Sequence, residues 1–230
     1  MTTRKNGLYQ DLKRQILTLE VDPDQVLDEA ALGEQYGLSR TPVRETLRRL
    51  AGEGFLKVRE NQGTRVIPMN DRTLRNFFQV APMIYEAICR LAVQNHKPSQ
   101  LQDLKCTQER FRRASVNGES LAMVLENNRF HEIMGEMAGS TYLEPSLGRL
   151  LIDHARIGHT FFRPHNEETQ KRLELSVTHH DGFIEAISDH DERRAVDLMK
   201  AHWELSRADM QRFIAPDGLH AQNLTGDSYL

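Results

Sequence analysis

Apolar side chains recur every three or four positions near the start of the chain, a spacing that places them on one face of an α-helix. The first such stripe consists of Leu8, Leu12, Ile16 and Leu19. Asp22-Pro23-Asp24 then interrupts it with a turn signal. A shorter apolar group runs from Ala30 to Tyr36 and ends at Gly37, a residue typical of helix C-termini. The pattern therefore predicts a long helix followed by a short one.

A third helix is predicted directly after this glycine. Ser39 is a good N-cap residue, and Pro42 falls in the first turn, where its missing backbone N–H is not needed. The stripe that such a helix would bury consists of Val43, Leu47 and Leu50. The short second helix and this third helix, joined by a tight turn, have the layout of a helix-turn-helix.

Two short segments after the third helix follow a strand pattern. Residues 55–59 and 64–67 alternate between apolar and polar positions, and the residues between them end on Gly63, as in a β-hairpin. A helix-turn-helix followed by a hairpin predicts a winged helix. Pro68 to Asp71 is then a short linker rather than a disordered tether.

The remainder of the chain shows helical stripes and no convincing strand. From Leu74 to Phe213 the stripes are separated by turn signals such as Lys97-Pro98-Ser99 and Gly139-Ser140, which predicts about six helices in an antiparallel bundle. We therefore expect a mostly α protein. A winged helix-turn-helix unit would occupy residues 1–70, an antiparallel all-α bundle residues 71–214, and a loose tail residues 215–230.

Composition narrows the class of protein. The chain has 230 residues, of which 39% are hydrophobic and 27% charged, so a disordered chain is excluded. We expect a cytoplasmic protein, because no apolar run approaches the roughly 20 residues of a membrane span and the N-terminus lacks a signal-peptide pattern. Cys89 and Cys106 are expected to be reduced thiols.

The net charge of −3 argues against a nucleic-acid partner until it is divided along the chain. Residues 1–70 hold 11 Lys and Arg against 10 Asp and Glu, a net charge of +1, whereas the remainder holds 19 against 23, a net charge of −4. Within the third predicted helix, only Glu45 opposes four arginines, namely Arg40, Arg44, Arg48 and Arg49. The whole-chain charge therefore hides a local basic face.

This basic helix has the residues of a DNA-reading element. A recognition helix presents its N-terminal turns to base edges, and arginine is the side chain that most often reads guanine. Arg40 stands at the helix start and Arg44 one turn later on the same face, and hydroxyls that could reach phosphate belong to Ser39, Thr41 and Thr46. The alternative is a solvated basic face, but the preceding short helix and the predicted wing favour DNA.

The run from Ser39 to Leu50, with Glu53-Gly54 after it, resembles the winged-helix signature of the GntR family, and the resemblance extends from Leu8 to Ile67. It implies a bacterial transcription regulator that binds a palindromic double-stranded DNA operator as a homodimer. In that family the residues at Arg40 and Arg44 read bases, Thr41 contacts the backbone and the Gly63 wing tip approaches the minor groove. Arg48 and Arg49 are assigned to phosphates.

The chain has ten histidines, and the helical periodicity separates them. Four lie on apolar stripes, each in a different predicted helix: His131, His154, His180 and His202. A single inward histidine is usually a hydrogen-bonded core residue, but four would each need a buried partner. Convergence on a cation satisfies several at once, since neutral imidazole binds zinc, nickel and other transition metals. Asn127, one turn before His131, would share its face.

Residues 74–213 resemble the C-terminal ligand-binding domain, called FCD, of FadR-type GntR regulators. The resemblance assigns a metal site to Asn127, His131, His180 and His202. Asn127 replaces the usual aspartate, so we expect weaker metal retention and a stronger pull on an anionic effector.

The effector site also departs from the family pattern. Many relatives have an arginine where this chain has Pro82, ahead of Glu86. Arg149 and Arg156 could replace that arginine as effector contacts, but they flank the apolar stripe and are expected at the surface. His154 points inward and is the better candidate.

Three functions remain open at this point. The leading one is a transcription regulator, with repression as the working assumption, whose operator affinity responds to a small carboxylate metabolite bound at a zinc or nickel site. The second makes the metal itself the signal. The third is a helical metalloenzyme, which we disfavour because no paired carboxylate stands on the inward faces to serve as a general base.

Overall fold

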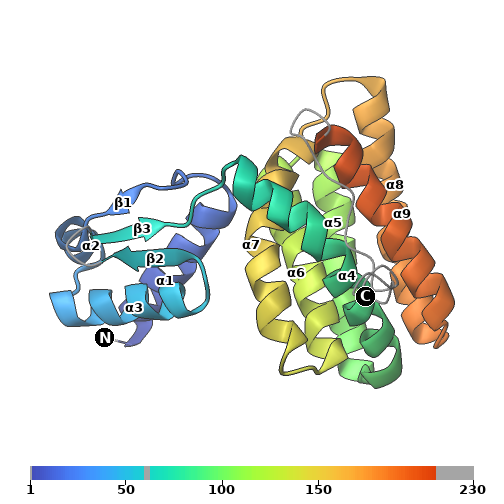
Figure 1. Ribbon diagram of the computed structural model, residues 1–230, viewed down its shortest axis with the longest axis horizontal. Coiled ribbons are helices and arrows are strands. Elements are labelled where there is room, and N and C mark those ends of the chain that lie inside the picture. Colours follow the sequence, from blue (N-terminus) through green and yellow to red (C-terminus); the bar gives the residue numbers. More distant parts are fainter. Residues whose placement is uncertain (1, 60–62, 211–230) are drawn as a thin grey trace, which may run out of the picture. The chain divides into compact units, whose positions relative to one another are not determined.

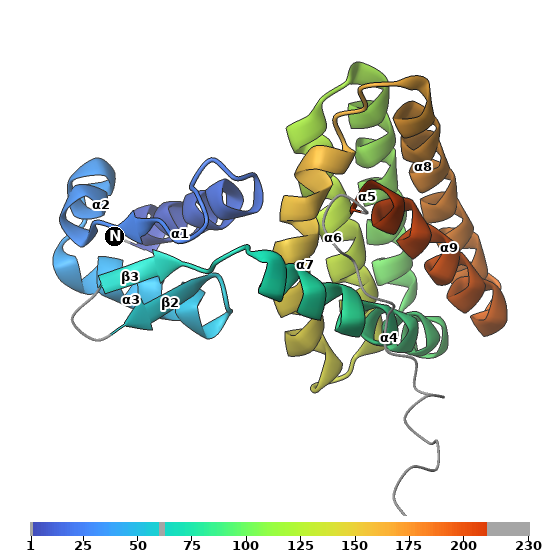
Figure 2. The same cartoon turned by 45° about the horizontal axis from the view of Figure 1, so that its top comes forward.

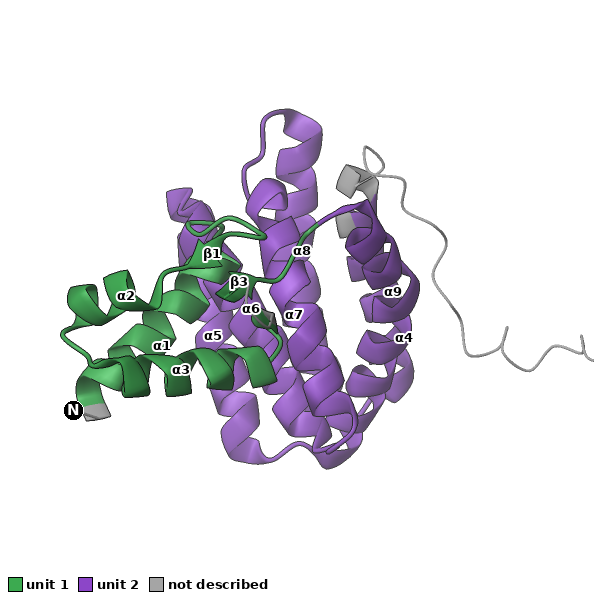
Figure 3. Cartoon of the chain, turned by 60° about the vertical axis from the view of Figure 1, so that its left-hand side comes forward, with its two compact units in different colours: residues 1–69 green, residues 70–230 purple. Residues whose placement is uncertain are grey.

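The computed structural model describes residues 2–59 and 63–210, which fall into two compact units. The first unit comprises residues 1–69 and the second residues 70–230 (Figure 3). The division lies inside the predicted linker, between Met69 and Asn70. The residues predicted as the loose tail, 215–230, lie outside the described residues, as do residues 60–62 of the predicted hairpin turn.

The first unit is a winged helix-turn-helix (Figure 1). Its elements are α1 (Thr2–Leu17), β1 (Val26–Leu27), α2 (Glu29–Tyr36), α3 (Arg40–Gly52), β2 (Leu56–Arg59) and β3 (Gly63–Val66). The three strands form an antiparallel sheet in the order β1-β3-β2, with Leu56 opposite Val66 and Val26 opposite Arg65. The sequence pattern does not reveal β1, because a strand of two residues is too short to show alternation.

Local chemistry places α2 and α3 as the sequence indicated, with one correction. The side chain of Asp28 caps α2 by accepting hydrogen bonds from the backbone N–H groups of Ala30 and Ala31. Gly37 ends α2 in the left-handed conformation, at φ +60°, which favours glycine. Ser39 does occupy the N-cap position of α3, but its side chain makes no capping hydrogen bond and remains exposed.

Side chains of α1, α3 and the sheet form the core of the first unit. Six of the residues on the two predicted helical stripes are almost fully buried: Leu8, Leu12, Ile16, Val43, Leu47 and Leu50. The prediction was wrong for Leu19, which lies beyond the end of α1 at φ +57° and is half-buried. Phe55, Leu56 and Val66 close the core from the sheet side. Because these residues occupy one face of α3, its opposite face is left to solvent.

The second unit consists of helices throughout its described part, as the sequence predicted (Figures 1 and 2). The helices are α4 (Asp71–Asn95), α5 (Pro98–Asn117), α6 (Ser120–Ala138), α7 (Leu143–Phe161), α8 (Glu167–Ser188) and α9 (Glu192–Met210). Helix α6 packs against α4, α5 and α7, while α9 packs against α4 and α8. The side chains of α6 therefore contribute much of the core of this unit. Among the described residues, no helix is long and apolar enough to cross a membrane.

The close packing of α6 on α7 generates a stability prediction. A Cβ added at buried Gly135 of α6 would lie 2.5 Å from Cδ2 of Leu147, which is itself buried in α7. We expect Gly135→Ala to lower the free energy of unfolding by about 1–3 kcal/mol, because a packed core does not accept the extra methyl group.

Gly148 of α7 offers a matched control, since it is exposed and a Cβ there meets nothing within 4 Å. Gly148→Ala should leave stability unchanged or raise it by about 0.5–1 kcal/mol, because alanine favours the helix. Urea unfolding followed by circular dichroism measures both variants. Equal effects of the two substitutions would show that packing at Gly135 does not matter.

Candidate functional site

The outward face of α3 carries the residues predicted to contact DNA. Thr41 and all four arginines of this helix are exposed: Arg40, Arg44, Arg48 and Arg49. Gly63 is also exposed and begins β3 at φ +75°, a conformation that favours glycine. Thr46 differs from the prediction: it is 1% exposed, and its hydroxyl donates to the backbone oxygen of Pro42. Thr46 shares the buried face of α3 with Val43 and Leu50, so we withdraw it as a phosphate contact.

Arg44 is held within the first unit by an acidic partner. Its Nε lies 2.7 Å from Oε2 of Glu29, the first residue of α2. The arginine side chain is nonetheless 57% exposed, so it can exchange this carboxylate for another acceptor. In the free protein, therefore, the ion pair with α2 holds the arginine that the family resemblance assigns to base reading.

Arg49 belongs to a second network, which connects α3 to α1. Its guanidinium lies over the ring of Tyr9, at 3.8 Å from the centroid, and its Nε donates to Glu53 at 3.0 Å. The Tyr9 hydroxyl donates to the same carboxylate at 2.6 Å. Burial, together with this hydrogen bond to Glu53, raises the pKa of Tyr9 to about 12, so the phenol keeps its proton. Arg49 is thus placed by a cation–π contact and an ion pair at the edge of the basic face.

Three imidazoles meet inside the second unit. His131 of α6, His180 of α8 and His202 of α9 are buried, and one ring nitrogen from each lies within 4.8 Å of the others. We call these three residues the histidine triad. Their ring centroids are separated by 5.1–5.6 Å. The periodicity placed His179 off the apolar stripe, and its side chain is only half-buried. Within the described part of the chain, His179 does not belong to the histidine triad.

The triad has the protonation state that a cation requires. Burial lowers the pKa of His180 to about 3 and the pKa values of His131 and His202 well below their ordinary value, with the neighbouring histidines adding to each shift. The rings are therefore neutral near pH 7 and keep one lone pair each.

The hydrogen bonding of the triad is incomplete in the described part of the chain. Both ring nitrogens of His131, Nε2 of His180 and Nδ1 of His202 are buried without a hydrogen-bond partner. Buried polar atoms in native proteins nearly always have a hydrogen-bond partner, so we expect these nitrogens to contact a bound ligand. The donor set, three neutral imidazoles close together, fits a divalent transition metal.

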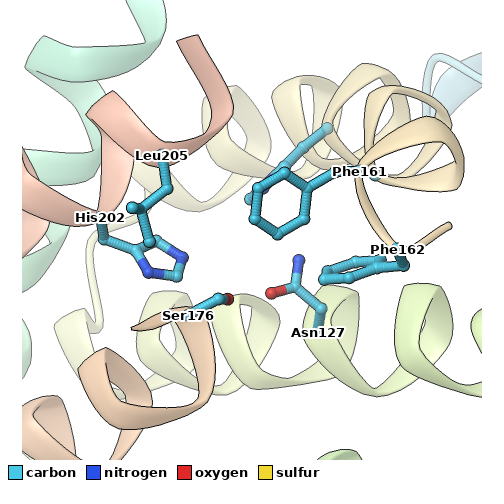
Figure 4. A pocket seen from close by; sticks show the side chains of 8 residues that line it. Asn127, Phe161, Phe162, Ser176, His202 and Leu205 are labelled. Atoms are coloured by element: carbon cyan, nitrogen blue, oxygen red, sulfur yellow. The ribbon is translucent and has the colours of Figure 1, made fainter. Parts of the chain in front are cut away.

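A small cavity is lined by Asn127 and by one member of the triad, His202 (Figure 4). The lining side chains come from four helices and point toward one another: Asn127 of α6, Phe161 at the end of α7 with Phe162 just after it, Ser176 of α8, and His202 and Leu205 of α9. His154 and Gly158 of α7 complete the lining. Asn127 lies one turn before His131, is 2% exposed and lines the cavity, so it lies on the same face of α6 as His131.

His154 lines the same cavity and lies close to the triad, with its ring centroid 5.0 Å from that of His131. Its Nδ1 is hydrogen-bonded to the hydroxyl of buried Tyr85 at 2.6 Å. Burial lowers the pKa of His154 to about 4 and raises that of Tyr85 well above its ordinary value, so both groups are neutral. The hydrogen bond to Tyr85 occupies Nδ1 of His154 and restrains the ring, and His154 is not grouped with the triad among the described residues.

The two arginines predicted as effector contacts do not line the cavity. Arg149 is paired with Asp153 at 3.0 Å. Arg156 was expected at the surface, and that expectation is wrong: it is 1% exposed and lies 3.5 Å from the same carboxylate. Because α7 packs against α4, α6 and α9, positions that flank its apolar stripe are also enclosed. Pro82, which stands where relatives have an arginine, is buried within α4.

Three residues of this region were missed by the sequence analysis. Ser176 precedes His180 by one helical turn, so the i, i+4 rule could have found it. Tyr85 and Gln108 contact His154 and His180 through hydrogen bonds that join residues 69 and 72 positions apart. A pairing at that sequence distance leaves no periodic signal, so only the fold reveals it.

The buried histidines make stability depend on pH. We expect the metal-free protein to lose stability as the pH falls below 6.5, the ordinary histidine pKa, because the unfolded chain binds protons that the folded chain excludes. The loss should continue toward pH values of about 4 for His154 and about 3 for His180. Thermal unfolding of chelator-treated protein at about pH 7.5 and about pH 5 measures this dependence.

His180→Gln should weaken the pH dependence, whereas His165→Gln, at an exposed position, should preserve it. A melting temperature that stayed constant over this pH range would contradict the burial of neutral imidazoles.

Comparison with known proteins matches both units. Residues 4–66 match the model of the bacterial regulatory proteins of the gntR family, and residues 77–205 match that of the FCD domain. An HTH-type transcriptional regulator of Bacillus subtilis, YdhC, is 22% identical over 196 residues, which is 85% of each chain. The HTH-type transcriptional repressor GlaR of Escherichia coli is 25% identical over 206 residues, covering 88% of this chain and 93% of the relative.

Solved structures show the same fold. Escherichia coli McbR/YncC superposes with a TM-score of 0.74 at 22% identity, over 92% of this chain and 99% of that one. A GntR regulator from Rhodococcus sp. RHA1 superposes with a TM-score of 0.69 at 14% identity, over 91% and 98%. GntR regulators bind DNA operators and often act as dimers, and this family and these relatives are regulators rather than enzymes. The chain therefore belongs to the GntR family of bacterial regulatory proteins, as a DNA-binding transcriptional regulator with an FCD domain.

Proposed function

We propose that this regulator responds to a small carboxylate metabolite bound at a divalent transition metal, zinc or nickel, within its FCD domain. The observation that carries the proposal is the histidine triad, with its buried ring nitrogens that lack hydrogen-bond partners. His131, His180 and His202 would hold the metal, and the amide oxygen of Asn127 would be the fourth protein ligand. A bound divalent ion supplies positive charge and open coordination positions for an anionic oxygen.

The cavity chemistry supports an anionic effector that depends on this charge. Among the described residues that line the cavity, none is lysine or arginine. All of the protein ligands in the proposed set are neutral, so they would leave the charge of the ion undiminished. Ser176 and His154 can each offer a hydrogen bond to a carboxylate, while Phe161, Phe162 and Leu205 form an apolar wall. These side chains suit a carboxylate with a compact apolar part.

Cavity size suggests how the effector would change the protein. The cavity has room for about one water molecule. A larger metabolite must therefore displace part of the wall. Phe162 is tightly placed, since its ring lies 3.1 Å from where a Cβ on Gly158 would be. Binding would thus favour a state in which the ends of α7 and α9 have moved apart, and a difference in operator affinity between the two states makes the effector a signal.

At the operator, we propose that two copies of the chain bind a palindrome as a homodimer joined through their helical units. Arg40 and Arg44 would read bases, while Ser39, Thr41, Arg48 and Arg49 would contact the backbone and Gly63 would approach the minor groove. The exposure of these residues supports the assignment. Repression is the mode we propose, and GlaR is one relative that bears the name of a repressor.

A second candidate keeps the same residues but makes the metal itself the signal. The observation that favours it is Asn127, because a neutral amide holds a divalent ion less firmly than a carboxylate does. Occupancy of the triad would then follow metal supply. This candidate needs no metabolite.

One experiment separates these candidates. Protein purified without added metal is analysed for its elements, and its operator affinity is measured with and without a chelator, zinc, nickel and a panel of small carboxylates. The first proposal expects carboxylates to change operator affinity only in the metal-loaded protein. If metal alone changed the affinity and no carboxylate did, the second candidate would replace it. If chelation changed neither the metal content nor the operator affinity, and carboxylates did not change the operator affinity either, the two candidates would both fail.

The role of Asn127 gives a prediction of its own. We expect Asn127→Asp to bind zinc at least 10-fold more tightly, because a carboxylate adds a charged ligand, and to weaken the carboxylate response, because the site becomes less positive. Competition with a chromophoric chelator measures zinc affinity. Asn117→Asp adds the same charge at an exposed position and should alter neither quantity. Equal zinc affinities for wild type and Asn127→Asp would remove Asn127 from the ligand set.

The assignments on α3 predict two distinguishable DNA phenotypes. We expect Arg44→Ala to lose about 1–3 kcal/mol of operator binding and to relax base preference at one position. Arg49→Ala should weaken binding to all sequences and reduce the salt dependence, because it removes a phosphate contact. Fluorescence anisotropy on DNA selected from a random pool, and on a scrambled duplex, measures both at several salt concentrations. Equal losses of specificity from the two variants would refute the assignment.

A further inference from the structure

Gln108 of α5 connects one member of the histidine triad to the neighbouring helix. Its side chain is 1% exposed and makes three hydrogen bonds to α8. Oε1 lies 3.0 Å from Nδ1 of His180. Nε2 donates to the backbone oxygen of Val177 and to Oδ1 of Asp181, both at 2.9 Å. Neither the family resemblance nor the sequence periodicity assigns a role to this residue.

The two acceptors determine which way the amide of Gln108 faces. A backbone carbonyl and a carboxylate can only accept hydrogen bonds, so the NH₂ group must be directed at Val177 and Asp181. The amide oxygen then faces His180 and can itself only accept. Nδ1 of His180 must therefore carry the ring hydrogen, which leaves the lone pair on Nε2.

The outer end of this arrangement is also held. Nη2 of Arg112 donates to the same Oδ1 of Asp181 at 2.6 Å. The hydrogen bonds thus run from Arg112 through Asp181 and Gln108 to His180, and they tie α5 to α8. Breaking any of these contacts would loosen the restraint on the imidazole.

Aromatic packing holds the ring of His180 in the same orientation. Phe130 stacks on it with centroids 4.0 Å apart and planes inclined by 5°, and Phe111 lies at 4.9 Å. Nε2 of His180 is buried, lacks a hydrogen-bond partner and lies on the side of the ring away from the Gln108 contact at Nδ1. By contrast, His131 has no hydrogen-bond partner at either ring nitrogen in the described part of the chain. The orientation of His180 is therefore fixed by a hydrogen bond and by aromatic packing before any ion arrives.

We propose that Gln108 is a positioning residue that fixes His180 as its Nδ1–H tautomer and so presents Nε2 to a divalent transition metal. This inference rests on the metal site proposed above. Partners of this kind, behind a metal-binding histidine, orient the ring and make the ligand more basic. Gln108 would do so from a helix, α5, that contributes no ligand to the proposed set.

The first test measures the tautomer directly, without metal. In full-length protein labelled with ¹⁵N-histidine, long-range ¹H–¹⁵N spectra show which ring nitrogen carries hydrogen, and His180→Gln identifies the signals. We expect Nδ1–H at His180 in the wild type and a mixture of both tautomers in Gln108→Met, which has a similar length but no acceptor. Gln102→Met, on the exposed face of the same helix, should match the wild type. An Nε2–H tautomer in the wild type would overturn the proposal.

The second test measures zinc affinity of the same variants by competition with a chromophoric chelator. We expect Gln108→Met to bind zinc about 10–100-fold more weakly, as is typical when such a partner is lost. Arg112→Met, a change at a side chain 42% exposed and therefore mild for folding, should produce a smaller loss, and Gln102→Met none. If folded Gln108→Met and Arg112→Met both bound zinc as the wild type does, Gln108 would have no positioning role.

The two proposals fail in different ways. Wild-type protein that bound neither zinc nor nickel would overturn the metal site, and the metal role of Gln108 with it, whatever the tautomer. Wild-type protein that bound zinc with an affinity unaffected by Gln108→Met would overturn the role of Gln108 alone.

Discussion

The helical unit is organised around uncharged imidazole nitrogens enclosed in its core. Burial strips His131, His180 and His202 of water and keeps them neutral, yet helices α6, α8 and α9 bring them together without supplying enough hydrogen-bond partners in the described part of the chain. An apolar core would be packed more simply by aliphatic side chains. The unit therefore retains buried ring nitrogens without a described hydrogen-bond partner, and the surrounding aromatic rings limit how the imidazoles can turn.

The two units solve opposite electrostatic problems. In the winged helix, charge is kept at the surface. Two arginines of α3 form ion pairs with nearby carboxylates, Arg44 with Glu29 and Arg49 with Glu53. In the helical unit, the three imidazoles of the histidine triad are kept uncharged and inside. This separation explains why the net charge of the whole chain carries so little information about its partner.

Periodicity predicted much of this arrangement because it reports which side of a helix is buried. It chose His180 over the adjacent His179, and it placed His131, His154 and His202 inward, since each lies on a stripe of apolar neighbours. It wrongly placed Arg156 at the surface, because the width of the enclosed face of α7 depends on how many helices pack against it. It also wrongly offered Thr46 as a phosphate contact, because that hydroxyl is buried and donates to a backbone oxygen of its own helix. It could not find Gln108, because the partners of that side chain are about 70 positions away.

The ion pair between Arg44 and Glu29 bears on how such a protein would search for its site. An arginine that already has a carboxylate partner gains little by exchanging it for one more phosphate oxygen, since one ionic contact replaces another. It gains more from a base edge that accepts both of its donors in a single plane. Random DNA would therefore hold the protein only briefly, and residence time would lengthen where the matching base is present. With Arg44 reading a base as proposed, the intramolecular carboxylate would thus act on the kinetics of target search, by lowering the attraction of every incorrect sequence.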